Sequence, residues 1–158
     1  MKSLVIYDSL YGNTEKIAQS IGNTIGKHGV VEVVRIGTVK PGQLAGNQLL
    51  VVGSPTQQFR PTASMKNFLI SIPKNGLLGI KVAAFDTRLT MSEIEKTPPL
   101  SFFVKIYGYA AARIANQLKK KGGELVIPAE GFFVEGMKGP LVEGELERAE
   151  KWARGLFA

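Results

Sequence analysis

Short apolar runs alternate along this chain with segments that have the periodicity of amphipathic helices. Five runs rich in β-branched and other apolar residues predict strands, at residues 4–7, 30–36, 49–52, 80–85 and 125–127. The fifth run meets Pro128, so its strand either ends there or resumes at residues 131–134. Helices are predicted from an N-cap at Asn13 or Thr14 to a stop at Gly29, and over residues 63–72, 100–121 and 143–156.

The strands are continuously apolar and do not alternate with polar residues, which is typical of strands buried on both faces. Strands interleaved with helices indicate βαβ units. No internal repeat, linker or low-complexity tract divides the 158 residues. We therefore predict a single α/β domain over residues 1–158, with a parallel sheet and helices on both faces.

The chain has no cysteine and one histidine, His28. Disulfides, thiolate metal sites, cysteine-ligated iron–sulfur clusters and cysteine nucleophiles are therefore excluded, and no histidine cluster is present for zinc or iron. We expect no metal site. The first apolar run ends at Asp8, and no run reaches 18 consecutive apolar residues, so we expect a cytoplasmic protein without a membrane span.

Three loops follow strands of the predicted sheet, at residues 8–14, 53–62 and 86–92. Ligands of open parallel sheets bind outside the carboxyl ends of the strands, so these loops are the candidate site. The first loop combines hydroxyls, a glycine and the free N–H groups of a helix N-terminus, which can bind a phosphate without a lysine. Taken alone, the same residues can also be a turn followed by a helix cap.

A wider stretch carries more information than this loop. Residues 8–18, Asp-Ser-Leu-Tyr-Gly-Asn-Thr-Glu-Lys-Ile-Ala, resemble the FMN-phosphate loop of the flavodoxin family, and especially that of the flavodoxin domains of flavodiiron proteins. Residues 53–56 resemble the family's second flavin loop, and residues 85–88 stand where its third belongs. The resemblance implies a doubly wound, five-stranded parallel sheet in the order 2-1-3-4-5 and FMN as the cofactor.

By this resemblance, the FMN phosphate is held by residues of the first loop: Ser9, Leu10, Tyr11, Gly12, Asn13 and Thr14. One side of the isoalloxazine ring is lined by Pro55, Thr56, Gln57, Gln58 and Phe59. The other side is lined by Asp86, Thr87, Arg88 and Leu89, although Asp86 can equally cap a turn. Tyr11 stands where the family more often has threonine or serine, and residues 86–92 contain no aromatic residue to stack on the ring.

Residues 88–100 form a long connection that is either a lid or partner surface, or a disordered excursion. Phe102, Phe103 and Tyr107 follow at near-helical spacing and are expected in the core. His28 and Lys119–Lys121 are read as solvated helix ends, and Trp152 as a packing residue.

The net charge of +7 is unevenly distributed. Residues 35–121 hold 13 basic and 3 acidic residues, a net charge of +10, and the rest of the chain carries −3. A positive surround favours electron uptake by a bound flavin, so we expect a reduction potential less negative than that of an acidic homologue. The same charge predicts an acidic redox partner, and no motif indicates nucleic acid. We expect a monomer or weak dimer.

Three functions follow from these observations. The first is an FMN-binding electron carrier, in which the flavin performs the redox chemistry and no side chain acts as a catalytic acid or base. The second is an FMN-dependent oxidoreductase, such as a quinone reductase or a protoporphyrinogen oxidase-like enzyme, whose substrate enters beside the 88–100 loop. The third is a flavin-free module that binds an acidic protein or nucleic acid.

Overall fold

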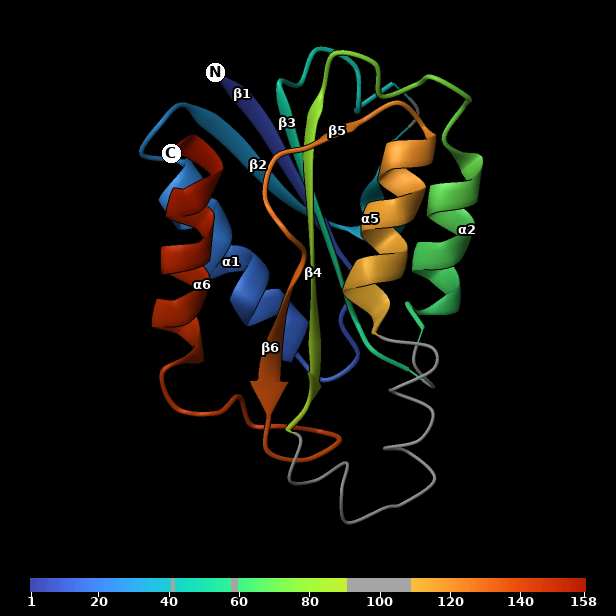
Figure 1. Cartoon of the computed structure of the whole chain (residues 1–158). Helices are drawn as coiled ribbons and strands as arrows, with labels where there is room; N and C mark the ends of the chain where they lie inside the picture. Colours follow the sequence, from blue (N-terminus) through green and yellow to red (C-terminus); the bar gives the residue numbers. More distant parts are fainter. Residues whose placement is uncertain (41, 58–59, 91–108) are drawn as a thin grey trace.

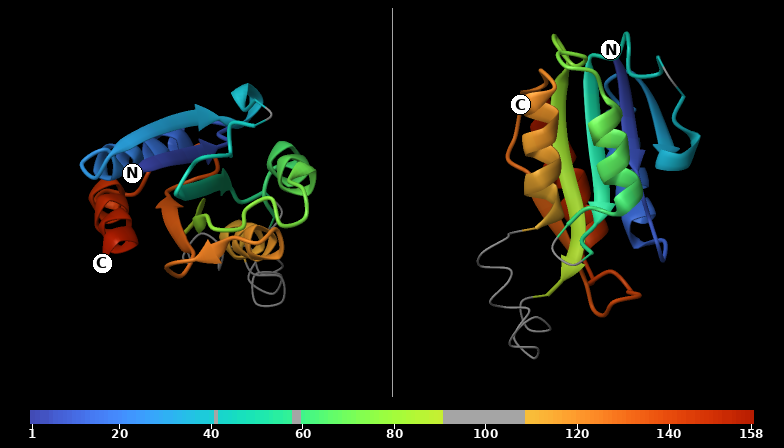
Figure 2. Two further views of the ribbon diagram at one scale, coloured as in Figure 1. Left: turned by 90° about the horizontal axis from the view of Figure 1, so that it is seen from above. Right: turned by 90° about the vertical axis from the view of Figure 1, so that its right-hand side faces the viewer.

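The structure, a computed structural model, describes residues 1–40, 42–57, 60–90 and 109–158. Its strands form one parallel sheet in the order β2-β1-β3-β4-β5, with β6 also paired to β4. Figures 1 and 2 show the twisted sheet with helices on both faces. The strands are β1 (Lys2–Tyr7), β2 (Val30–Arg35), β3 (Leu49–Pro55), β4 (Lys81–Leu89), β5 (Glu124–Leu125) and β6 (Glu130–Val134).

The fifth strand is split into two segments that follow one another along β4. Glu124 and Leu125 pair with the beginning of β4, and Glu130 to Val134 pair with its second half. Pro128 lies between the segments and has no N–H to donate to the ladder, which explains the interruption. The resumption of the strand after Pro128 is therefore confirmed, and so is the predicted order 2-1-3-4-5.

Helices cover both faces of the sheet, as Figure 2 shows. On one face lie α1 (Asn13–Ile25) and α6 (Glu145–Arg154), and on the other α2 (Ala63–Ser71) and α5 (Ala110–Lys120). Leu4 and Ile6 of β1 are buried with α2 and α5, whereas Val5 and Tyr7 are buried with α1. Successive residues of the strand therefore enter different cores, which explains the continuous apolar runs.

Short 3-10 turns, η1 (Ile36–Thr38) and η2 (Gly155–Phe157), follow β2 and α6. The closing helix thus ends at Arg154, and its last predicted residues continue as η2. Trp152 packs in the core on the α1–α6 side, and its indole N–H donates to the Pro128 carbonyl at 3.3 Å. Within the described ranges, no helix combines the length and apolar character needed to cross a bilayer.

Strands β3 and β4 run further than their apolar runs predict. The ladder between them continues through Ser54 paired with Asp86 and Pro55 paired with Thr87, and β6 supports the end of β4 from its other side. Residues 53–55 and 86–89, which the sequence assigns to loops, are therefore strand. Neighbouring strands on both sides of β4 satisfy the backbone of these polar residues.

The predicted helix over residues 100–121 is wrong at Tyr109, which is extended (φ −123°, ψ 166°), so α5 begins at Ala110. Asp86 accepts the Ala111 N–H at this helix end. Residues 100–108, with Phe102, Phe103 and Tyr107, lie outside the described residues.

The N-cap of α1 is also corrected. Gly12 occupies it, in the left-handed conformation (φ 93°), rather than Asn13 or Thr14. Ser9 supplies the oxygen instead: its Oγ accepts the Gly12 N–H at 3.0 Å and the Glu15 N–H at 3.4 Å. At its other end α1 stops at Ile25, about one turn before Gly29.

Glu145, the first residue of α6, joins that helix to β6. Its carboxylate accepts the Phe133 N–H at 2.7 Å and two N–H groups of Arg148, at 2.8 Å and 2.6 Å. Burial by itself raises the pKa of the Glu145 carboxyl, but the hydrogen bonds from Arg148 and Phe133 and the charge of Arg148 outweigh burial and lower it. The charged carboxylate therefore stabilises the attachment of α6 to the sheet.

Replacing Glu145 by Gln removes this charge and keeps the side-chain shape, so we expect the free energy of unfolding at pH 7 to fall by about 1–3 kcal/mol. The pKa of Glu145 is lower in the folded state than in the unfolded state, where it is about 4.3. The stability that the Glu145 charge contributes is therefore present above the unfolded pKa and is lost as the pH falls through the folded pKa. Urea unfolding of wild type and E145Q should give a difference that shrinks on acidification. The exposed Glu147, changed to Gln, is the control; a difference independent of pH would contradict the assignment.

Candidate functional site

Four chain segments meet at the carboxyl edge of the sheet, at the bottom of Figure 1. They are residues 8–14 after β1, residues 56–57 and 60–62 between β3 and α2, the end of β4, and residues 135–140 after β6. The last segment is missing from the sequence-based candidates. Its Gly136, Gly139 and Pro140 directly follow a strand, which is the same signal that identifies the other loops.

The first loop has backbone N–H groups without an acceptor among the described residues. Among the described residues, no hydrogen bond has the N–H of Leu10, Tyr11, Asn13 or Thr14 as its donor. The N–H groups of Asn13 and Thr14 belong to the first turn of α1, where a helix has no internal acceptors. Together with Gly12 at φ 93°, which brings the backbone close to a ligand, these donors suit a phosphate group.

Two buried side-chain contacts attach the first loop to its neighbours. Asp8 accepts the hydroxyl of Thr62, the N-cap of α2, at 2.5 Å, and its other oxygen accepts the Ser9 N–H at 2.9 Å. The hydroxyl of Thr14 lies 2.8 Å from that of Thr87 on β4. The start of α1 is therefore held against both β4 and the start of α2. Of the residues predicted for the third loop, Thr87 is the one brought directly against the first loop.

Asp86 is fully buried, and its two oxygens are engaged by protein groups. Arg88 donates to them through Nε at 2.7 Å and Nη2 at 2.8 Å, and Ala111 N–H donates at 2.9 Å. Burial raises the pKa of the Asp86 carboxyl, and the Arg88 guanidinium and the Ala111 N–H oppose this increase. Asp86 therefore caps the start of α5 by accepting the Ala111 N–H.

Arg88 is held from two sides. Its guanidinium carbon lies 3.6 Å from the centre of the Tyr109 ring, which is a cation–π contact. A Cβ added at position 131 would meet the guanidinium, so Gly131 leaves room for the arginine beside β6. Tyr109 thereby brings an aromatic ring to the end of β4, although residues 86–92 contain none. Leu89, beside it, is half-buried.

The second loop is described only in part, because Gln58 and Phe59 lie outside the described residues. Pro55 ends β3, and the Thr56 N–H donates to the Thr87 carbonyl at 2.9 Å. Gln57 and Arg60 exchange backbone hydrogen bonds at 2.8 Å. The end of β3 and the start of α2 therefore both lie near the first loop, since Thr62 contacts Asp8.

Two cationic side chains lie beside the first loop and are not among the residues predicted from the sequence. Arg35, at the end of β2, donates to the Ser9 carbonyl at 2.9 Å and to Glu15 at 3.0 Å. Lys138, after β6, accepts the Asn13 side-chain N–H on its carbonyl at 3.1 Å, and its Nζ lies 5.9 Å from the centre of the Tyr11 ring. Both residues are far from residues 8–14 in sequence, so the local motif does not indicate that they lie beside the loop.

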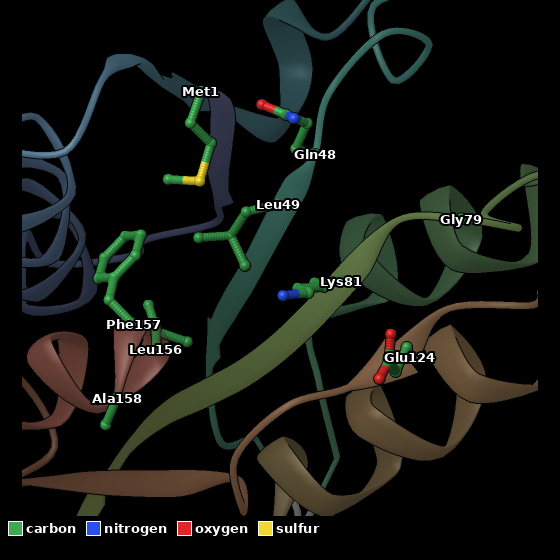
Figure 3. A pocket seen from close by; sticks show the side chains of 9 residues that line it. All are labelled: Met1, Gln48, Leu49, Gly79, Lys81, Glu124, Leu156, Phe157 and Ala158. Atoms are coloured by element: carbon green, nitrogen blue, oxygen red, sulfur yellow. The ribbon is translucent and has the colours of Figure 1, made fainter.

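A separate hollow of about 420 Å³ lies at the opposite, amino edge of the sheet (Figure 3). Leu49, Lys81 and Glu124, at the starts of their strands, line it with Met1 and Phe157. None of the predicted site residues lines this hollow, so it does not belong to the candidate site.

Comparisons with known proteins agree with the geometry at the carboxyl edge. The flavodoxin family model matches residues 5–152 of this chain. A search of curated proteins found no match. Solved structures similar to this chain include oxidised flavodoxin 1 from Bacillus cereus, with 18% identity and a TM-score of 0.78, covering 99% of this chain and 97% of that one.

Two further structures share the fold. A flavodoxin from the domain Archaea is 23% identical, with a TM-score of 0.74 and coverage of 99% of this chain and 96% of that one. The flavodiiron core of a Synechocystis protein is 18% identical, with a TM-score of 0.65 and coverage of 99% and 35%. At these identities the structures establish the fold, and the family model over residues 5–152 establishes that the chain belongs to the flavodoxin family, whose cofactor is FMN.

Proposed function

We propose that this protein binds FMN non-covalently at the carboxyl edge of the sheet and transfers electrons between redox partners. The observation that carries the proposal is the set of N–H donors around Gly12 at the start of α1, in a chain that matches the flavodoxin family model over residues 5–152. When bound, FMN supplies the redox chemistry, and the protein supplies binding, orientation and electrostatic tuning.

The phosphate half of the proposed site is residues 9–14. The N–H groups of Leu10, Tyr11, Asn13 and Thr14 donate to phosphate oxygens in this proposal, and the α1 dipole adds partial positive charge. Ser9 already accepts the Gly12 and Glu15 N–H groups, so its hydroxyl shapes the loop and has its own proton left to donate.

The ring half of the proposed site lies between the second loop and the end of β4. Pro55, Thr56 and Gln57, with Gln58 and Phe59, line one side, and Thr87, Arg88 and Leu89 line the other. Asp86 contributes to the second side by holding Arg88 in place, since its oxygens already accept from Arg88 and Ala111. Because the Asp86 carboxylate offsets the charge of Arg88, the guanidinium in this proposal shapes that side of the ring site more than it adds net charge.

The rim of the site suits an acidic redox partner with some apolar surface. Leu10, Tyr11 and Met137 are 47%, 50% and 77% exposed, and Lys138 lies beside Tyr11. Lys138 and Arg60 form no ion pair among the described residues, so both charges are available to a carboxylate. An apolar surface that is flanked by cations favours rapid, salt-sensitive association with an acidic protein.

Changing Gly12 to Ala tests the phosphate loop. The left-handed conformation costs an L-residue about 1–2 kcal/mol, and relaxation of that strain turns the N–H donors away, so we expect the Kd for FMN to rise at least about tenfold. Flavin fluorescence quenching measures the Kd, and the purified wild-type protein should be yellow and release FMN on denaturation.

The matched control is Gly144 to Ala. Gly144 is the N-cap of α6 with φ 90°, close to the 93° of Gly12, and in both positions an added Cβ meets no atom within 4 Å. Both variants should lose similar stability, and only G12A should lose FMN affinity. Equal Kd values for G12A and wild type would contradict the proposed phosphate site.

Small redox probes test the charge of the rim. The rate of electron transfer from the reduced protein to ferricyanide, an anion, should fall as ionic strength rises, whereas the rate to a hexaamminecobalt(III) cation should rise. Lys138 to Gln should reduce the salt dependence with ferricyanide, and Lys27 to Gln, on the exposed turn after α1, should not. A rate that rises with ionic strength for ferricyanide and falls for the cation would rule out an acidic partner at this rim.

A further inference from the structure

One guanidinium makes three contacts behind the first loop. Arg35 ends β2, where it pairs in register with Tyr7 of β1, and its side chain reaches residues of both the loop and α1. Nη1 donates to the Ser9 carbonyl at 2.9 Å, Nη2 donates to Glu15 at 3.0 Å, and the guanidinium carbon lies 5.5 Å from the centre of the Tyr7 ring. The planar group therefore joins β1, the loop and α1.

The Ser9 contact bears on the direction of the backbone donors. The carbonyl of Ser9 and the N–H of Leu10 belong to the same rigid peptide plane and point in opposite directions. A hydrogen bond that holds this carbonyl toward Arg35 therefore holds the Leu10 N–H away from Arg35. Arg35 thus limits rotation of the first peptide of the loop, whose N–H is among the proposed phosphate donors.

The Glu15 contact bears on charge. Glu15 lies in the first turn of α1, where the helix dipole favours a carboxylate, but the same helix end is proposed to hold the FMN phosphate. An unpaired carboxylate there repels a phosphate dianion. The ion pair with Arg35 offsets that charge and holds the Glu15 side chain toward β2.

We propose that Arg35 is a positioning residue for the FMN phosphate: it fixes the peptide between Ser9 and Leu10 and offsets the charge of Glu15, and so selects FMN over riboflavin. This inference rests on the proposed FMN site. The Arg35 and Glu15 side chains are 45% and 40% exposed, and exposed ion pairs contribute little to stability. Arg35 therefore acts on ligand affinity with little effect on folding.

Binding of FMN and riboflavin to the apoprotein, measured by fluorescence quenching, separates the phosphate from the ring. We expect R35Q to raise the Kd for FMN about tenfold, the scale of one lost charge-assisted hydrogen bond, with the Kd for riboflavin and the Tm nearly unchanged. R35K keeps the charge but cannot donate to Ser9 and Glu15 from two N–H groups of one plane, so its Kd for FMN should lie between those of wild type and R35Q. K27Q removes a distant positive charge and should bind both flavins as wild type does.

The double variant R35Q/E15Q tests the role of charge. Removing the Glu15 carboxylate should recover part of the FMN affinity lost in R35Q. If no affinity is recovered, the claim that Arg35 offsets the charge of Glu15 is wrong. Equal losses for FMN and riboflavin, or an unchanged Kd for FMN in R35Q, would overturn the role of Arg35 while the FMN site stands. Failure of the wild-type protein to bind either flavin would overturn the proposed function itself.

Discussion

The burial of the sheet on both faces is the constraint on which the rest of this structure depends. Central strands covered by helices have no access to water, so their N–H and carbonyl groups must pair with neighbouring strands along their whole length. β4 illustrates the consequence, since β3 pairs with it as far as Thr87 and β6 pairs with it as far as Leu89. Loops lie at the two ends of the sheet, and because the strands are parallel, each helix that follows a strand begins at the carboxyl edge.

Buried polar contacts at that edge hold the first loop and the starts of α2 and α5 against the end of β4. Asp8 with Thr62 and Thr14 with Thr87 join the start of α1 to α2 and β4, while Asp86 ties Arg88 to the start of α5. Each pair links segments that are distant in sequence, and each is a hydrogen bond largely shielded from water, where an unpaired partner is costly. The loops are thereby held in place by side chains that need not touch the ligand.

The electrostatics of the edge differ from what the net charge alone indicates. Arg88 and Arg35 are each paired with a carboxylate, so their effect is to shape the site as much as to charge it. Lys138 and Arg60, in contrast, form no ion pair among the described residues and leave positive charge at the rim. The unpaired cations are the part of the +7 that a partner would meet.

Apolar periodicity was enough to predict the α/β class and the parallel sheet, because each depends on residues close together in the chain. The motif at residues 8–14 is local too, and the phosphate site assigned to it is a proposal. The family resemblance added the strand order. Strand ends at Pro55 and Leu89, the Gly12 cap and the break at Tyr109 were not predictable in this way, since pairing partners decide where a polar residue continues a strand or a helix begins. Arg35 and Lys138 join the site through β2 and β6, so only the tertiary structure, which brings distant strand ends to one edge, could reveal them.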